Sequence, residues 1–178
     1  PAATGIGMKA GGVLIDYIAI KGNNVTNVPI DNPVQIPAHK YHQDCLMGLP
    51  TGDKKTTPKF ERGRYVSLHG EEIVFVSGTA AITGEKTANP EDVEQQTQLT
   101  IDNIDRLISK DNLSKNITVS RDLKFNYLRI YVKEKKDFQK VREICENRYG
   151  NVPMVWLQAN ICRDDLTVEI EGTLLVVK

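Results

Sequence analysis

From Phe60 onward, apolar and polar residues recur with the periods of regular secondary structure. Apolar residues at alternate positions predict a strand, because successive side chains in a strand point to opposite faces of the sheet. The turn residues at 68–71 predict a hairpin between the first two such segments. Strands are predicted at 62–67, at 72–77 with a continuation at 79–83, at 125–132, at 153–161 and at 166–177.

Two segments between these strands have helical periodicity. Asn89 can cap the first helix, and Pro90 suits its first position. The second helix is predicted to start near Asp137 and to end at Gly150, because glycine tolerates the left-handed conformation of a helix C-terminus. In the first helix, which runs to about Lys110, one stripe is predicted to face a core: Val93, Thr97, Ile101, Ile104 and Ile108.

The order strand, strand, helix, strand, helix, strand, strand predicts an α/β domain at 60–178. Two amphipathic helices can cover only one face of a mixed sheet, so the other face is left for function or for a partner. Residues 1–59 are expected to form an N-terminal extended arm with a buried strand at 13–20. Recurrent prolines allow only short extended pieces in this arm: Pro29, Pro33, Pro37, Pro50 and Pro58.

Alternation also assigns side chains to the two faces of the sheet. The aliphatic sets that include Leu128 and Ile130, and Val155 and Leu157, are predicted to face the helices. A face with large aromatic side chains beside amides, arginine and carboxylates is typical of a subunit interface with a ligand pocket. On the uncovered face we expect Phe125, Tyr127, Arg129, Tyr131, Met154, Trp156, Gln158, Asn160, Cys162, Glu169 and Glu171.

Composition excludes several classes of function. The 178 residues contain 23 Lys plus Arg and 23 Asp plus Glu, and zero net charge argues against nucleic-acid binding by bulk phosphate attraction. No apolar run approaches the roughly 20 residues of a membrane span. Three cysteines without CxxC spacing predict neither disulfides nor a zinc cluster, and His39 and His42 have no evident third ligand. We therefore expect no cofactor, metal, nucleic acid or membrane partner, and a cytoplasmic location.

Three motifs resemble the RidA/YjgF superfamily, also described as endoribonuclease L-PSP-like or translation-initiation-inhibitor-like. They are Ile73-Val-Phe-Val-Ser-Gly-Thr-Ala80, Asp92-Val-Glu-Gln-Gln-Thr97 and Leu166-Thr-Val-Glu-Ile-Glu171. The resemblance implies a chorismate-mutase-like fold, a homotrimer, and ligand clefts between subunits. Imine deaminases of this superfamily carry a carboxylate-binding arginine where this sequence has Met154. Because a thioether cannot form that bidentate clamp, imine deamination by the usual route is not expected.

Further motifs are similar to the C-terminal half of chorismatases, and they include the proline-rich arm. Chorismatases are built from two RidA-like halves and cleave the enolpyruvyl ether of chorismate into pyruvate and a cyclic acid. The resemblance implies a small carboxylate as substrate. Since the chain begins Pro-Ala-Ala without methionine, we also expect a fragment or a shortened relative. The motifs lie at 30–41, 58–63, 77–81, 128–132 and 157–163.

Glu169 matches the active-site glutamate of the family. Cleaving an enol ether requires a proton donor, and a carboxyl group among apolar walls has a pKa high enough to donate near neutral pH. Glu171 lies on the same face and ranks second. The alternative for Glu169 is an ordinary acid on a wet strand edge.

Arginines on the same face are predicted to bind the substrate carboxylates. Arg129 is the first candidate, with an intersubunit salt bridge as its alternative role. Arg62 and Arg163 are further candidates, and a surface arginine is the alternative for each. Tyr41 would fold over the cleft or simply pack. Other predicted substrate-binding residues are Tyr131, Ala80, which resembles a small residue that leaves room for a ring, and Cys162, as a pocket wall without an identifiable base.

Two functions from different classes remain open. The first is a chorismatase-like hydrolase or lyase that acts on chorismate or a related small carboxylate. The second is a non-catalytic metabolite-binding trimer, or a deaminase-like relative without the usual arginine. Release of pyruvate from chorismate distinguishes the first from the second.

Overall fold

The computed structural model describes residues 1–7, 11, 13–46, 48–50, 52–118 and 122–176. Its body is a six-stranded sheet in the order β1-β2-β3-β8-β6-β7, in which only β6 and β7 are parallel neighbours. The strands of this sheet are β1 (Val25–Ile30), β2 (Gly63–Leu68), β3 (Glu71–Ala80), β6 (Leu123–Val132), β7 (Met154–Gln158) and β8 (Val168–Val176). The other elements are a small hairpin of β4 (Ile82–Thr83) and β5 (Lys86–Thr87), the helices α1 (Val93–Leu107), α2 (Lys110–Leu113) and α3 (Phe138–Tyr149), and 3-10 turns at Ala38–Lys40, Gln43–Cys45 and Lys135–Asp137.

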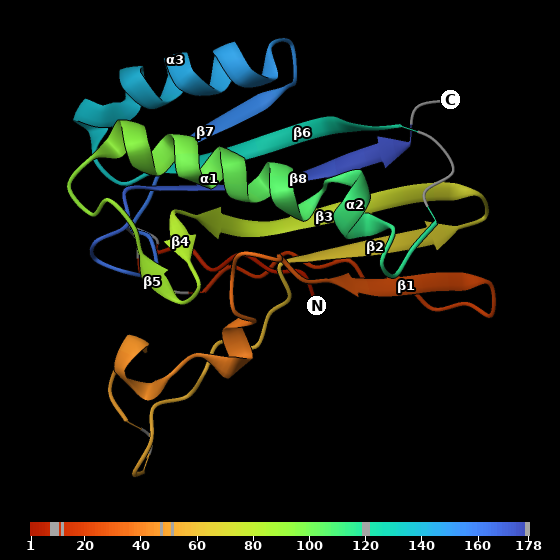
Figure 1. Ribbon diagram of the computed structural model, residues 1–178, viewed down its shortest axis with the longest axis horizontal. Coiled ribbons are helices and arrows are strands. Elements are labelled where there is room, and N and C mark those ends of the chain that lie inside the picture. The colour runs from red at the N-terminus through yellow and green to blue at the C-terminus, as the bar shows by residue number, and fades with distance from the viewer. Residues whose placement is uncertain (8–10, 12, 47, 51, 119–121, 177–178) are drawn as a thin grey trace.

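The predicted order of strands and helices from residue 60 onward is confirmed, and so is the α/β class. A parallel pair of strands needs a crossover connection, and α3 provides it between β6 and β7. Figure 1 shows α1 and α3 on the same side of the sheet. The predicted single helical layer is therefore present.

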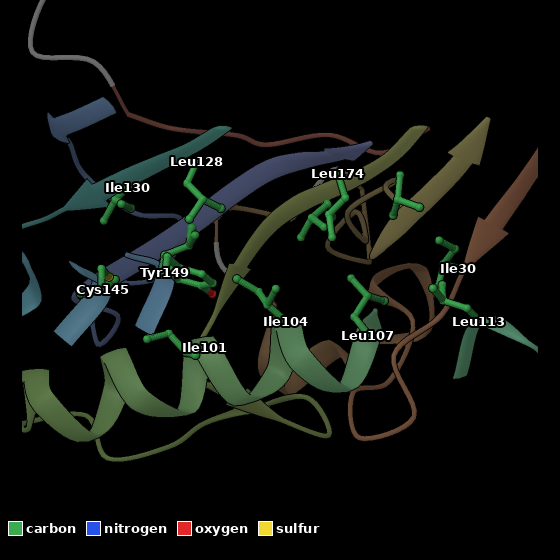
Figure 2. Close-up of a cluster of buried hydrophobic side chains, with 14 of the residues drawn as sticks. Ile30, Ile101, Ile104, Leu107, Leu113, Leu128, Ile130, Cys145, Tyr149 and Leu174 are labelled. Atoms are coloured by element: carbon green, nitrogen blue, oxygen red, sulfur yellow. The ribbon is translucent and has the colours of Figure 1, made fainter. Parts of the chain in front are cut away.

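The main core lies between this helical layer and the sheet. Figure 2 shows Ile101, Ile104 and Leu107 of α1 directed toward the strands, where Leu128 and Ile130 of β6 meet them. All five side chains are fully buried. Ile101 and Ile104 of the stripe predicted for the first helix thus pack as expected, because residues three and four apart share one face of a helix. Leu107, which was not part of the predicted stripe, joins them in the core.

The first helix begins later than predicted. Asp92 is its N-cap, and the Asp92 carboxylate accepts hydrogen bonds from the backbone N–H groups of Glu94 and Gln95, at 3.0 Å each. Asn89 does not cap; it adopts a left-handed backbone conformation with φ of 51°. A carboxylate at the N-terminus also interacts favourably with the helix dipole, which favours Asp92 over an asparagine one turn earlier.

The predicted faces of β7 are wrong. Met154 and Trp156 pack against the main core, whereas Val155 and Leu157 are 51% and 38% exposed on the other face. The pairing explains this assignment, since Met154 lies opposite Leu128 of β6 and shares its helix-facing orientation. Because β7 is apolar at both sets of positions, alternation alone does not indicate which set faces inward.

The predicted face of Phe125 is also wrong. Phe125 packs against the main core, and its ring meets that of Tyr149 edge-on at 5.3 Å between centroids. The register of β6 against β8 shifts between Phe125 and Tyr127. Such a bulge adds one residue to the strand and reverses the facing of every residue before it.

The predicted buried strand at 13–20 is wrong for the single chain. This segment has no regular secondary structure, and Val13, Leu14 and Ile15 are 74% to 86% exposed. Burial of such a run requires an apolar surface, and within the described chain none covers it. The next segment of the predicted arm does join the sheet, since residues 25–30 form the edge strand β1 beside β2.

The rest of the arm is attached to the α/β body at defined points. The Asn32 side-chain amide donates to the backbone oxygen of Asn103 at 2.8 Å, and the Gln35 amide donates to that of Ile82 at 3.0 Å. Beyond these contacts the segment with the first two 3-10 turns, orange in Figure 1, projects away from the sheet. It has a small core of its own, formed by Ala38, Tyr41 and Leu46 with Phe60 packed against them.

Candidate active site

Glu169 is held in a space that only a glycine leaves open. It lies on β8, opposite Ala80 of β3 and Tyr131 of β6, and is 5% exposed. A Cβ atom on Gly78 would be 1.9 Å from Glu169 Oε1, so the carboxyl group sits where any other side chain would begin. The register of β3 shifts between Val76 and Thr79, and this bulge brings the Gly78 backbone next to the carboxyl group.

Burial controls the proton affinity of Glu169. The pKa of Glu169 is raised to about 8, first because burial removes the group from water and second because of the Glu171 charge, while Arg62 opposes both. Among the described residues, no hydrogen bond to the Glu169 carboxyl group stabilises the ionised form. The group is therefore largely protonated near neutral pH, which is the state that a general acid needs.

Two arginines converge on Tyr41 near this carboxyl group. Arg62 is 3% exposed, and its guanidinium donates to the backbone oxygen of Ile36 at 2.9 Å and to the Tyr41 hydroxyl. Arg163 donates from Nη1 to the backbone oxygen of Glu85 at 2.8 Å. The two guanidinium carbons lie 5.6 Å and 5.2 Å from the centroid of the Tyr41 ring. Tyr41 thus joins the two cations, as a cation–π partner of both.

Each of these arginines has a buried donor to spare. Arg62 Nε and Arg163 Nη2 are shielded from water and have no hydrogen-bond partner among the described residues. A buried donor without an acceptor costs about 1–3 kcal/mol and more when it is charged, so such donors are rare unless a ligand completes them. The pair is suited to bind a carboxylate or another anion.

Cys162 lies beside the same groups. Its thiol is shielded enough, and close enough to the Glu169 charge, that its pKa is raised to about 11, while Arg163 and Arg62 act in the opposite direction. The Cys162 residue as a whole is nevertheless exposed to solvent. The thiol is protonated near neutral pH and is therefore a poor nucleophile, in keeping with its predicted role as a wall of the pocket.

Arg129 and Tyr131 are engaged by Glu171. Glu171 Oε1 accepts hydrogen bonds from Arg129 Nη1 at 2.9 Å and from the Tyr131 hydroxyl at 2.8 Å. Burial and the Glu171 carboxylate raise the pKa of Tyr131 to about 12. Arg129 therefore forms a salt bridge with Glu171 within one chain, and the intersubunit salt bridge named as its alternative role stays a prediction. Arg129 and Tyr131 hold the Glu171 carboxylate in place. The negative charge of Glu171 is in turn one cause of the raised pKa of Glu169.

The structure brings together some predicted site residues and separates others. Met154, Trp156 and Phe125 face the helices and lie outside the site. Gly78 was missed, although an isolated glycine inside a strand pattern is a recognised signal of a bulge or a close approach. The residues that gather around the carboxyl group and the cations are Glu169, Glu171, Ala80, Tyr131, Cys162, Arg62, Arg163, Tyr41 and Gly78.

A hollow of about 490 Å³ lies elsewhere, with Phe125, Tyr149 and Leu174 in its lining. These residues belong to the main core on the helix side, so the hollow shares no side chain with the cluster around Glu169. The described residues contain no group of three His, Cys, Asp or Glu side chains arranged to bind a metal. In the same part of the chain, no helix has the length and apolarity of a membrane span.

The family model for endoribonuclease L-PSP matches residues 58–176. The chain belongs to this family, that is, to the RidA/YjgF superfamily. The resemblance inferred from the three sequence motifs is thus confirmed. The matched region contains Gly78, Arg62, Cys162 and Glu169, but not Tyr41.

Curated relatives extend the similarity of this L-PSP family member over the arm. The chain is 35% identical over 187 residues to a 3-hydroxybenzoate synthase of Streptomyces hygroscopicus, which covers 98% of this chain and 51% of the relative. It is 34% identical over 177 residues to a chorismatase of the same organism, which covers 97% and 48%. The chain therefore spans about half the length of these relatives.

Solved structures agree with the sequence relatives. A chorismatase crystal structure is 31% identical, with a TM-score of 0.69 over 85% of this chain and 44% of that one. The yeast protein YEO7 is 10% identical, with a TM-score of 0.57 over 85% of this chain and all of its own, and it shows the fold alone. The predicted chorismatase resemblance is confirmed at the level of the fold and the family.

Proposed function

We propose that this protein is a chorismatase-like enzyme that cleaves the enolpyruvyl ether of chorismate or of a related small carboxylate, with Glu169 as the proton donor. The single observation that carries the proposal is the Glu169 carboxyl group, 5% exposed on the sheet face without helices and with a pKa raised to about 8. An acid with its pKa near the working pH is the most effective proton donor. The chorismatase and 3-hydroxybenzoate synthase relatives supply the reaction class.

The reaction needs a proton and a water molecule. The Glu169 carboxyl group gives its proton to the methylene carbon of the enolpyruvyl group, which leaves a cation stabilised by the ether oxygen. Water adds to the adjacent carbon. The resulting hemiketal breaks the bond between that carbon and the ring oxygen, and its hydroxyl proton passes to the ring oxygen, which gives pyruvate and the ring alcohol. The proton lost by the water returns to Glu169, so the acid is regenerated.

The substrate carboxylates need fixed cations. In this proposal Arg62 and Arg163 bind one of them through Arg62 Nε and Arg163 Nη2, whose hydrogens have no other acceptor among the described residues. Tyr41 holds the two guanidinium groups in place through its ring. Arg129, which is already paired with Glu171, has fewer donors to offer.

The test is the release of pyruvate from chorismate by the purified protein. Glu169→Gln keeps the shape of the side chain but has no acidic proton, and loss of a general acid lowers the rate by about 10²–10⁴-fold. Glu171→Gln is the matched control, because it lies two residues along the same strand and retains an acceptor for Arg129 and Tyr131. We expect the control to remain within about tenfold of the unmodified protein, since only a neighbouring charge is lost.

Three outcomes decide between the alternatives. Near-normal pyruvate release by Glu169→Gln, together with loss of activity in Glu171→Gln, would show that Glu171 and not Glu169 is the proton donor. Activity in both variants places the site elsewhere. A thermal shift with chorismate but no pyruvate from the unmodified protein favours the non-catalytic binding trimer, which is the second function left open by the sequence.

A further inference from the structure

Glu169 is more deeply buried than its position predicts. It lies on the face of the sheet away from α1 and α3, where Val155 and Leu157 of β7 are 51% and 38% exposed. Glu169 itself is only 5% exposed. Another part of the chain must cover it. Asp16 of the segment at 13–20 reaches this face at Arg129, 4.0 Å away, but a different described segment crosses the face beside Glu169.

That segment is residues 1–7, which we call the N-terminal strap. At one end, the backbone oxygen of Pro1 accepts a hydrogen bond from the Glu61 N–H at 3.0 Å, just before β2. At the other end, the Gly7 N–H donates to the backbone oxygen of Asn160 at 2.9 Å, just after β7. In the sheet order, β3, β8 and β6 lie between these two anchors, so the strap spans the strand that carries Glu169.

The middle of the strap is fastened beside the carboxyl group. The Ala3 N–H donates to Ser77 Oγ at 3.1 Å, and Thr4 Oγ1 accepts from the Gly78 N–H at 2.8 Å. A Cβ atom on Gly78 would be 2.8 Å from Thr4 Cγ2 and 1.9 Å from Glu169 Oε1. Because both groups adjoin that one point, the Thr4 methyl group and the Glu169 carboxyl group lie side by side.

We propose that the N-terminal strap forms the roof of the site and that Thr4 is a positioning residue, which seals the Glu169 carboxyl group from water and holds the Gly78 backbone against it. The geometric part of this inference stands without the proposed reaction; its catalytic consequence rests on the proposed function. The bulge in β3 is what makes the contact available, since it turns the Gly78 N–H toward the strap.

The strap acts by excluding water and not by its charge. Residues 1–7 contain no charged side chain. Loosening the strap admits water to the carboxyl group and so favours its ionised form. The titratable and charged side chains that face Glu169 from the other described elements stay in place: Glu171 on β8, Tyr131 on β6, Arg62 before β2, and Cys162 after β7.

The test is an infrared titration of the Glu169 carboxyl group in the full chain. The band of the protonated acid is assigned by its loss in Glu169→Gln. Thr4→Ala removes the acceptor for Gly78. Gly7→Ala adds a Cβ atom 2.9 Å from Asn160 Cβ and so displaces the far anchor. Gly5→Ala is the control within the strap, because a Cβ atom there meets nothing within 4 Å.

We expect the titration midpoint to fall by at least about one pH unit in Thr4→Ala and in Gly7→Ala, and to stay unchanged in Gly5→Ala. Thr4→Ser restores the hydroxyl group and should return the midpoint most of the way. Midpoints that stay unchanged in both loosened variants, with melting temperatures that show them folded, overturn the proposal. So does a shift in Gly5→Ala as large as in the other two.

This measurement uses no substrate, so it separates the strap from the proposed reaction. If chorismate is not cleaved but the midpoint falls, the strap inference stands and the proposed function fails. If pyruvate is released but the midpoint does not move, the proposed function stands and the strap inference fails. When both stand, the high-pH limb of pyruvate release moves down together with the infrared midpoint.

Discussion

Glu169 and Gly78 form one functional unit, because the carboxyl group of one occupies the space that a side chain on the other would need. A glycine is usually discussed for its backbone freedom, but Gly78 has no positive φ angle. Its value lies in the missing Cβ atom. The acid and the glycine must therefore be considered together when either is changed.

Gly78→Ala is expected to abolish most pyruvate release while leaving the protein folded. The new methyl group would lie 1.9 Å from Glu169 Oε1, so the carboxyl group must turn away from its position. A flexible side chain can give way, and we expect a loss of stability of about 1–3 kcal/mol. Urea denaturation beside the pyruvate assay checks both parts. Full activity in Gly78→Ala would show that the observed carboxyl position is not the working one.

Stability is expected to fall as the pH rises from about 4.5 to about 8. The pKa of Glu169 is raised from 4.5 to about 8 in the folded protein, so in this window the folded state holds a proton that the unfolded state has lost. The loss amounts to at most about 5 kcal/mol, and it is complete above the folded pKa. Glu169→Gln cannot ionise and should lack this slope. Urea denaturation at about pH 5 and about pH 9 measures the free energy of unfolding of the unmodified protein and of Glu169→Gln. An equal change between the two pH values in both proteins would contradict the assignment of the raised pKa to Glu169.

The role of a residue was predictable from the sequence where it belongs to a motif. It was not predictable where the role depends on contacts between residues far apart in the chain. Glu169 was identified from the motif of β8. Arg129 was preferred over Arg62 because it lies among aromatic residues, yet Glu171 engages Arg129, while Arg62 retains a buried donor without a partner. A hydrogen bond between residues 42 positions apart leaves no trace in local sequence, so this ranking required the structure.

Among the elements, α1 shows how a helix start depends on more than residue preference. Asn89 and Asp92 are both good capping residues, and Pro90 favours the earlier start. The observed cap is Asp92, whose carboxylate takes two backbone hydrogen bonds. Its pKa is lowered because these bonds stabilise the charged form.

Asp92→Ala is expected to lower the melting temperature by a few degrees, since it leaves two N–H groups of the first turn without their acceptor. Asn89→Gly is the matched control and should change stability little, because glycine adopts the left-handed conformation of Asn89 at least as readily. Thermal or urea denaturation measures both. A larger loss in Asn89→Gly than in Asp92→Ala would mean that the turn, and not the cap, fixes the start of α1.

The type and order of the elements were predictable because each long segment has a clear period. Facing was predictable only where one face of a strand is polar. In β8, Glu169 and Glu171 mark the face without helices, and this assignment holds. In β6 the bulge reverses Phe125, and in β7 both faces are apolar. Neither a bulge nor the choice between two apolar faces is encoded in alternation itself.

For the whole molecule, we expect assembly into a homotrimer through the sheet face away from the helices. Val155, Leu157 and Leu175 are 38% to 51% exposed, and the apolar segment at 13–20 is more exposed still. Isolated apolar side chains on a surface need no explanation, but a set on one sheet face together with an apolar segment indicates a contact surface. The homotrimer that the family resemblance implies would cover it.

Light scattering at micromolar concentration measures the assembly directly. Leu157→Lys places a charge on the exposed face of β7 and should dissociate the trimer. Asn147→Lys adds the same charge on the exposed surface of α3 and serves as the control. A monomer in the unmodified protein would contradict the expected assembly, and a trimer that survives Leu157→Lys would place the contact on another surface.

The doubly apolar β7 also bears on how the chain folds. A strand that slips by one residue exchanges its two faces, and in β7 this places Val155 and Leu157 in the core at little cost in apolar burial. Moreover, β7 is parallel to β6, so their pairing closes the long connection that contains α3, and we expect this step to be slow. If the chain shifts register during folding, we therefore expect the shift at this strand. Trp156, the single tryptophan of the chain, lies at its centre, so its fluorescence follows the step that sorts the native register from the shifted one.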